Sequence, residues 1–252
     1  MKKTLFLLAV LILATTSCSK TARNESQLVK AMLSDDYDEA KQGLADCYEW
    51  LRTDKETMTY DFPLMKEKLG MKVNTSADGM VRLYSWLSNI ENSAASYANA
   101  VQWKVDDKMV AFTGPLNMLF KQRKVDISNR STQAHSIDTI FDIDKTTPHV
   151  YMVVQSYVDE EGMTLVYVSA FTRQGLKLAI LPFYFDGMES AGNRVFIDDG
   201  DVKKSELIKW DPKEMRLYSY LTDDNNHVIP GKYEIYVLGR NQFTRTGPDQ
   251  EQ

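Results

Sequence analysis

The sequence predicts a mainly β fold, in which three antiparallel, blade-like meander repeats follow a short N-terminal helical segment. One observation is the spacing of apolar residues, which is helical up to about residue 71 and alternating from about residue 72 on. The other is a succession of short runs rich in Val, Ile, Tyr, Phe and Leu, bounded by Asp, Asn, Gly and Pro. Since no long helical stretch separates these runs, the strands are expected to pair in antiparallel fashion.

The N-terminal helical segment is expected to span residues 27–71. Apolar side chains recur at helical spacing along residues 27–52, where we expect a short first helix and a longer second one. The longer helix begins after the N-cap residue Asp36 and ends near residue 52. A third, short helix is expected over residues 63–69, because proline stands at its first position and glycine directly follows it.

The β domain is expected to span residues 72–252 and to consist of three related units. Arg-Leu-Tyr-Ser-Trp at 82–86 is nearly repeated by Arg-Leu-Tyr-Ser-Tyr at 216–220, and Met-Val-Val-Gln-Ser-Tyr at 152–157 lies between them. The stretches align on a serine, which follows a turn in each unit and precedes a second aromatic strand by 15 to 18 residues. The three serines are Ser85, Ser156 and Ser219, and the three aromatic residues are Trp103, Phe171 and Tyr236.

The arrangement of the three units is left open by the repeat. Units that cannot bury their own faces stack on their neighbours, as the blades of a propeller do. Three units are fewer than a closed propeller usually has. We therefore expect a β-sandwich, a partial propeller capped by the N-terminal helices, or a ring completed by association.

Residues 1–17 have the pattern of a signal peptide. Two lysines precede an apolar run of about ten residues, too short for a bilayer span of roughly twenty. Small residues then lead to Cys18, which resembles the lipobox of bacterial lipoproteins, with Thr15 at the position usually held by leucine. The resemblance implies that Cys18 is lipidated and that residues 18–26 are a lipid-bearing cysteine and a polar tether. An ordinary secretory signal is the alternative.

The lipid anchor predicts where the protein lies. Stable anchoring requires two or more acyl chains, such as palmitate, which a triacylated cysteine supplies. Ser19 follows Cys18, and the usual Gram-negative sorting rule then implies the outer membrane. Whether the protein faces the periplasm or the cell surface stays open, although no acidic run after Cys18 supports surface display.

Composition and cysteine content exclude several classes of function. The formal net charge is −5, and no basic cluster occurs, which argues against a nucleic-acid partner. With Cys18 assigned to lipid, Cys47 is the remaining cysteine, so one chain cannot build a disulfide framework. Cys47 lies at helical spacing with Leu44 and Leu51 and is expected to be a small buried hydrophobe.

The stretch Thr-Ile-Phe-Asp-Ile-Asp-Lys-Thr-Thr at 139–147 matches the first motif of haloacid-dehalogenase phosphatases, with Asp142 and Asp144 as the two acids. Such an enzyme needs a parallel sheet and a helix after the motif. Here Pro148 and another β-branched run follow. In the repeat, Asp144 aligns with Asp211, where a strand ends in a turn. We therefore predict a strand and a turn in place of a catalytic motif.

Other polar residues give no strong catalytic signature. The three histidines, His135, His149 and His227, lack metal-binding spacing and are expected on surface loops. Acidic pairs at turns are expected to be solvated. These pairs are Asp106-Asp107, Glu160-Glu161, Asp198-Asp199 and Asp223-Asp224. We predict no catalytic residue, no metal site and no cofactor.

Aromatic residues make up 11% of the chain, and most are expected in the core. Strand alternation places Tyr84 and Trp86 on one face of their strand, and Tyr218 and Tyr220 on one face of theirs. These four side chains are the candidate ligand-binding residues.

Three segments resemble a group of functionally uncharacterised lipoproteins of Gram-negative, gut-type bacteria. They are Phe-Pro-Leu-Met-Lys-Glu-Lys at 62–68, the strand from Asp78 to Trp86, and Gly-Lys-Tyr at 231–233. The resemblance spans most of the chain after the signal peptide and carries no known chemistry. Together with the anchor and the repeats, it leads us to expect a non-enzymatic envelope protein that binds a protein or glycan. A hydrolase that uses carboxylates in a cleft between units is the alternative.

Overall fold

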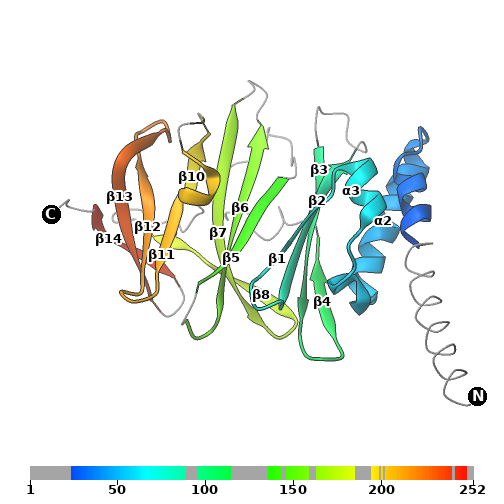
Figure 1. The fold of residues 1–252 in the computed structure, drawn as a ribbon, viewed down its shortest axis with the longest axis horizontal. Helices are drawn as coiled ribbons and strands as arrows, with labels where there is room; N and C mark the ends of the chain where they lie inside the picture. The colour runs from blue at the N-terminus through cyan, green and yellow to red at the C-terminus, as the bar shows by residue number, and fades with distance from the viewer. Residues whose placement is uncertain are drawn as a thin grey trace, which may run out of the picture.

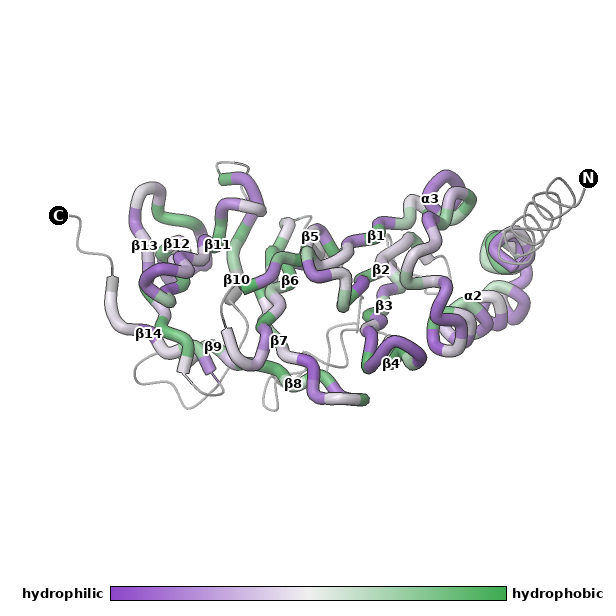
Figure 2. Tube along the Cα trace, turned by 60° about the horizontal axis from the view of Figure 1, so that its bottom comes forward, coloured by the Kyte–Doolittle hydropathy of each residue, from purple (hydrophilic) through white to green (hydrophobic). Residues whose placement is uncertain are grey.

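The computed structural model describes residues 24–88, 96–114, 136–143, 146–158, 163–184, 194–198, 200, 202–239 and 242–248. These residues form a row of four layers: a helical layer, then three sheets that stack face to face (Figure 1). Figure 2 shows the same order from another side, with hydrophilic and hydrophobic residues both present along α2. The mainly β fold with an N-terminal helical segment is therefore confirmed, and the sheets stack in the manner of blades.

The helical layer agrees with the predicted elements. A first helix covers residues 24–32, α2 covers Tyr37–Thr53, η1 covers Lys55–Met58 and α3 covers Pro63–Leu69. The Asp36 side chain accepts hydrogen bonds from the first free N–H groups of α2, which makes it the predicted N-cap. The first helix begins three residues before its expected start, so the predicted tether is shorter than 18–26. Residues 1–23, with the predicted signal peptide and Cys18, lie outside the described residues.

The N-terminus of α3 is capped from a distant part of the chain. Its N-cap residue, Phe62, has a left-handed backbone and no capping side chain. The fully buried carboxylate of Glu25 instead accepts a hydrogen bond of 2.8 Å from the Met65 N–H and one of 2.7 Å from the Tyr60 hydroxyl. An anion at this end of a helix satisfies an unpaired N–H group. Glu25 thus fixes the first helix onto α3.

The first sheet is an antiparallel meander in the order β1-β2-β3-β4. Its strands are β1 (Lys72–Thr75), β2 (Val81–Ser88), β3 (Ser96–Lys104) and β4 (Val110–Thr113). Alternation along β2 divides its side chains between two cores. Tyr84 and Trp86 pack under the helical layer, while Val81 and Leu83 pack against the second sheet.

The second sheet has the order β10-β7-β6-β5, and β8 pairs with the other half of β7. Its strands are β5 (Ser136–Ile143), β6 (Val150–Val158), β7 (Thr164–Gln174), β8 (Lys177–Leu181) and β10 (Arg194–Ile197). The third sheet has the order β11-β12-β13-β14-β9. Its strands are β11 (Ile208–Asp211), β12 (Arg216–Thr222), β13 (Val228–Leu238), β14 (Phe243–Pro248) and β9 (Phe183–Tyr184), and η3 (Lys204–Glu206) precedes β11. β9 pairs with β14 in parallel, so a short strand from the middle of the chain closes one edge.

The predicted repeat corresponds to the three sheets. Ser85, Ser156 and Ser219 each lie on the second strand of a sheet, and each pairs with the first residue of the strand before it. Those partner residues are Lys72, Ser136 and Ile208. The predicted aromatic residues lie on the third strands, β3, β7 and β13. The sequence alignment therefore matches equivalent positions of the three meanders.

The third unit is turned over relative to the other two. The serine face of β2 points to the next sheet, where the Ser85 hydroxyl accepts a 3.1 Å hydrogen bond from the Ile137 N–H. The serine face of β6 also points to the next sheet, since Met152 packs in the core with the third sheet. The serine face of β12 points back, because Leu217 lies in that same core. The first two sheets follow one another like blades, whereas the last two face each other like a sandwich.

Candidate functional site

The structure separates the four predicted ligand-binding residues into two groups. Tyr84 and Trp86 are fully buried between the helical layer and the first sheet. The prediction that they bind a ligand is therefore wrong, since α2 and α3 cover the face on which they lie. Tyr84 donates a 2.6 Å hydrogen bond to the buried Gln102 side chain, and burial raises the pKa of Tyr84 well above its ordinary value. Both side chains serve packing.

Strand alternation places Tyr218 and Tyr220 on the outer face of the third sheet, and Tyr220 also packs against the core between the second and third sheets. They alternate along β12 with Leu217 and Ser219, which are fully buried toward the second sheet. The outer face continues across β13, where Ile235 is paired with Tyr218 and Tyr233 with Tyr220. The rings of Tyr220 and Tyr233 lie 4.5 Å apart, and the hydrogen bond with Tyr220 raises the pKa of Tyr233 to about 12.

The surroundings of these tyrosines are exposed and include positively charged side chains. Val237 is 37% exposed, and Lys209 and Arg216 are exposed on the neighbouring positions of the same face. We call the surface formed by Lys209, Arg216, Tyr218, Tyr220, Tyr233, Ile235 and Val237 the tyrosine face. It lies at the opposite end of the row of layers from the helices (Figure 1).

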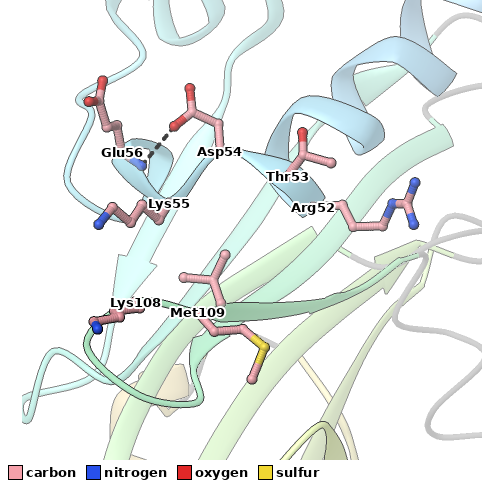
Figure 3. A pocket seen from close by; sticks show the side chains of 8 residues that line it. Arg52, Thr53, Asp54, Lys55, Glu56, Lys108 and Met109 are labelled. Carbon is pink, nitrogen blue, oxygen red and sulfur yellow. Dashed lines mark hydrogen bonds between the residues drawn. The ribbon is translucent and has the colours of Figure 1, made fainter.

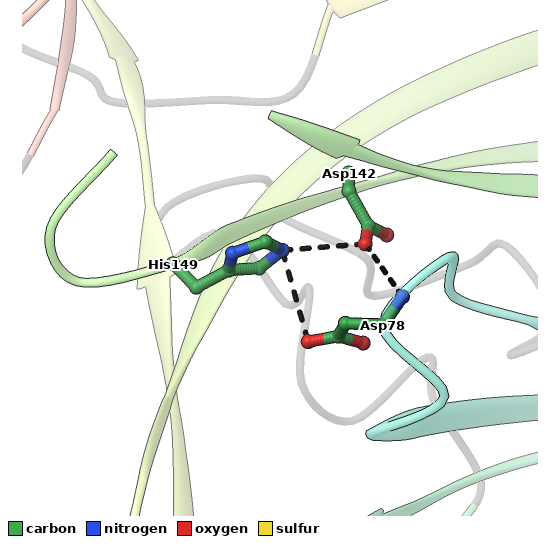
Figure 4. A group of neighbouring side chains, drawn as sticks. All are labelled: Asp78, Asp142 and His149. Atoms are coloured by element: carbon green, nitrogen blue, oxygen red, sulfur yellow. Dashed lines mark hydrogen bonds and ion pairs between the residues drawn. The ribbon is translucent and has the colours of Figure 1, made fainter. Parts of the chain in front are cut away.

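A second group of polar side chains converges where the first and second sheets meet (Figure 4). Asp78 comes from the turn between β1 and β2, Asp142 from β5, and His149 from the position just before β6. One ligand atom from each lies within 4.8 Å of the others. The His149 Nε2 atom lies 3.3 Å from an Asp142 carboxylate oxygen and 3.8 Å from an Asp78 carboxylate oxygen.

Hydrogen bonds fix both carboxylates of this group. Asp142 accepts hydrogen bonds from the backbone N–H groups of Ala77 and Asp78, at 3.2 and 3.1 Å. Asp78 accepts hydrogen bonds from the Ser76 hydroxyl, the Met80 N–H and the Tyr151 hydroxyl. Burial alone raises the pKa of Asp78, but these three hydrogen bonds and the nearby histidine outweigh it and lower the pKa.

Tyr151 connects the group to a further layer of contacts. Its hydroxyl accepts a 2.9 Å hydrogen bond from Arg173, whose guanidinium also donates to the Lys104 carbonyl of the first sheet. Burial, followed by the hydrogen bond to Asp78, raises the pKa of Tyr151, so its hydroxyl stays a donor. The first and second sheets are thus joined by a continuous polar network.

Asp142 of the phosphatase-like motif lies in a strand, as predicted. It lies in β5, which pairs with β6 in antiparallel register, so the parallel sheet that the enzyme requires does not follow the motif in the described residues. Asp144 lies outside the described residues. Sequence analysis missed the grouping of Asp142 with His149. The short β5–β6 connection places them near each other, but Asp78 joins them only through the stacking of two sheets.

A hollow of about 360 Å³ lies between the end of α2 and the turn before β4 (Figure 3). Charged side chains line much of it, including Arg52, Lys55, Glu56 and Lys108. The Asp54 carboxylate is engaged as the cap of η1, where it accepts a 2.9 Å hydrogen bond from the Glu56 N–H. Ligand pockets are mostly apolar. Met109 and Val110 are the apolar part of this hollow, and the rest of its lining is charged or polar.

The remaining predicted positions are structural. Cys47 is fully buried on the inner side of α2, and burial raises the pKa of its thiol far above the usual range, which confirms the small-hydrophobe prediction. Asp106 and Asp223 accept backbone hydrogen bonds within their turns, as solvated turn residues do. His227 is exposed in the turn before β13. His135, Glu160, Glu161 and Asp199 lie outside the described residues.

The fold and these contacts define a class: a stack of β meanders capped by helices at one end, with a partly exposed tyrosine face at the other. Comparisons with family models, with curated proteins and with solved structures find no match to this chain. The resemblance to the lipoprotein group therefore stays a prediction. None of the described helices has the length and apolar character needed to cross a membrane.

Proposed function

We propose that this protein is a lipid-anchored component of the bacterial envelope that binds a protein or glycan partner without catalysis. The partner contacts the tyrosine face of the third sheet. The observation that carries the proposal is the position of this partly exposed tyrosine face, which ends a stack whose other sheet faces are buried among the described residues. Tyrosine and arginine side chains of this kind are enriched where proteins bind partners.

The position of the helical layer close to Cys18 in the sequence supports the same proposal. The described fold begins at residue 24, in the helical layer, six residues after Cys18. A six-residue tether spans at most roughly 20 Å. A lipid on Cys18 then holds the helical layer near the membrane, and the tyrosine face points away from it, toward possible partners.

The proposal is tested by thermal unfolding of the full-length protein, extracted in detergent, with a panel of envelope and dietary glycans. A ligand at about 100 times its Kd should raise Tm by roughly 5–10 °C for a chain of this size. The shift should disappear in Tyr218→Ala and Tyr220→Ala. It should persist in Tyr37→Ala, because Tyr37 is a 58% exposed tyrosine of α2 and is the matched control.

If no glycan shifts Tm, a photo-crosslinking amino acid at position 218 tests for a protein partner in intact cells. A partner crosslinked from position 218 and not from position 37 supports the proposal. Absence of both a glycan shift and a position-specific crosslink overturns it.

The alternative is a carboxylate-dependent hydrolase, and the convergence of Asp78, Asp142 and His149 is the observation that favours it. Both carboxylates of that group already accept hydrogen bonds from the protein, which suits a joint between sheets better than a general acid or base. The hydrolase would be favoured if the protein hydrolyses a glycan of the same panel and if Asp142→Asn abolishes that hydrolysis.

A further inference from the structure

The group formed by Asp78, Asp142 and His149 contains a polar atom whose surroundings need an explanation. The His149 Nε2 atom is buried and has no hydrogen-bond partner among the described residues. It nevertheless lies 3.3 Å from Asp142 and 3.8 Å from Asp78. Both separations are within ion-pair range, but neither contact is a hydrogen bond, and a buried nitrogen that makes no hydrogen bond is costly.

A cation between the three side chains removes this cost, and the spacing fits one. Protein ligands lie about 2.0–2.2 Å from a tetrahedral zinc ion, which places neighbouring ligand atoms roughly 3.4 Å apart. Two of the three separations, 3.3 and 3.8 Å, lie close to that value, and all three ligand atoms lie within 4.8 Å of one another. The three side chains therefore need to move only slightly to reach one ion.

Both carboxylates are oriented by hydrogen bonds, as carboxylates that bind metals usually are. The Asp78 oxygen nearest to His149 accepts a 2.8 Å hydrogen bond from Tyr151, and the corresponding oxygen of Asp142 accepts one from the Asp78 N–H. A carboxylate oxygen can accept more than one contact, so each keeps a position for an ion. Outer hydrogen bonds of this kind orient metal ligands and are part of a working site.

The ligand types select the class of metal. Ca²⁺ and Mg²⁺ prefer oxygen ligands, whereas an imidazole together with carboxylates suits Zn²⁺ and similar transition metals. The side chains of Asp78 and His149 are 28% and 35% exposed, so a fourth position faces solvent. We propose that Asp78, Asp142 and His149 bind one divalent transition-metal ion, with Zn²⁺ the best fit, and thereby clamp the first sheet to the second.

The test is metal binding by the full-length protein in detergent, after chelator treatment and dialysis, measured by calorimetry with Zn²⁺, Mn²⁺ and Ca²⁺. We expect one Zn²⁺ per chain, with affinity at least tenfold weaker in His149→Ala. His227→Ala, which alters an exposed histidine of the third sheet, should bind as the unaltered protein does. Zn²⁺ at about 100 times its Kd should also raise Tm by roughly 5–10 °C.

A second variant distinguishes loss of Zn²⁺ binding from loss of folding. His149→Gln keeps a polar side chain at this position, and unchanged unfolding by tryptophan fluorescence with lost Zn²⁺ binding supports the site. Co²⁺ absorption bands typical of a four-coordinate nitrogen and oxygen site, absent in both His149 variants, support it independently. Zn²⁺ binding that is absent, or equal in the unaltered protein and His149→Ala, overturns the proposal. Binding of Ca²⁺ in preference to Zn²⁺ overturns the assignment of the metal class.

Discussion

The strands β2 and β12 carry nearly the same five residues in opposite surroundings. In β2, residues 82–86 are buried, and Tyr84 and Trp86 have no exposed surface. In β12, residues 216–220 alternate between buried residues and fully or partly exposed ones, and Tyr218 and Tyr220 lie on the tyrosine face. Both strands occupy the second position of a meander. The difference comes from the helical layer, which covers one copy and not the other.

Burial changes what each polar group requires. Arg82 donates a 2.6 Å hydrogen bond to the Thr57 carbonyl of η1, and Tyr84 donates to Gln102, which in turn donates to the Leu51 carbonyl of α2. Their equivalents, Arg216 and Tyr218, share an exposed contact with Glu214. Similar side chains are thus internal hydrogen-bonding groups in one sheet and surface groups in the other, because the helical layer buries only the first set.

The largest difference in stability between the two strands is expected at the aromatic residue that follows each serine. Trp86→Ala should lower the free energy of unfolding by about 3–5 kcal/mol, because it leaves a large cavity under the helical layer. Tyr220→Ala should cost less, roughly 1–2 kcal/mol, from the lost contacts with the Tyr233 ring and with the edge of the core between the second and third sheets. Chemical denaturation followed by circular dichroism measures both. Equal costs would mean that the helical layer does not stabilise the first sheet.

A smaller effect is expected when only a hydroxyl group is removed. Tyr84→Phe should cost about 1 kcal/mol, since the buried Gln102 side chain loses a donor at 2.6 Å. Tyr218→Phe should change the free energy of unfolding by less than about 0.5 kcal/mol, because its hydroxyl group contacts an exposed carboxylate. The same denaturation measurement applies, and a cost for Tyr218→Phe as large as that for Tyr84→Phe would contradict the comparison.

The two surroundings should also differ in the reactivity of a thiol group, and this test is expected to change stability least. The thiolate is the reactive form, and burial raises the pKa of Cys47, so iodoacetamide at pH 8 should leave Cys47 unmodified until the protein unfolds. A cysteine introduced by Tyr218→Cys should react in the folded state. Peptide mass spectrometry identifies the modified position. Rapid modification of Cys47 in the folded protein would show that the helical layer opens readily.

The sequence predicted the fold well wherever local patterns decide it. Asp36, Pro63 and Gly70 mark helix ends through their own backbone and side-chain chemistry, and all three do so in the structure. The serine-centred repeat located the second strand of each sheet. The cap of α3 by Glu25 was not predictable in this way, since the two lie 40 residues apart in sequence.

The candidate site was only half predictable for the same reason. Alternation placed Tyr84 with Trp86, and Tyr218 with Tyr220, but it does not tell which face of a sheet is covered. That depends on where the helices pack and on the reversal of the third sheet. The junction of Asp78 with Asp142 and His149 likewise depends on stacking, because Asp78 comes from a different sheet.

The capping of α3 by Glu25 has a mechanical consequence. Tension applied to the chain ahead of residue 24 would enter the described fold at that residue, next to Glu25. It is then carried to α3 through the hydrogen bonds of Glu25 to Met65 and Tyr60, and from Met65 and Leu69 to the buried rings of the first sheet. The hydrogen bonds of Glu25 between the first helix and α3 therefore resist this tension. Proteolytic removal of residues up to Glu25 would abolish these hydrogen bonds and expose the N-terminus of α3.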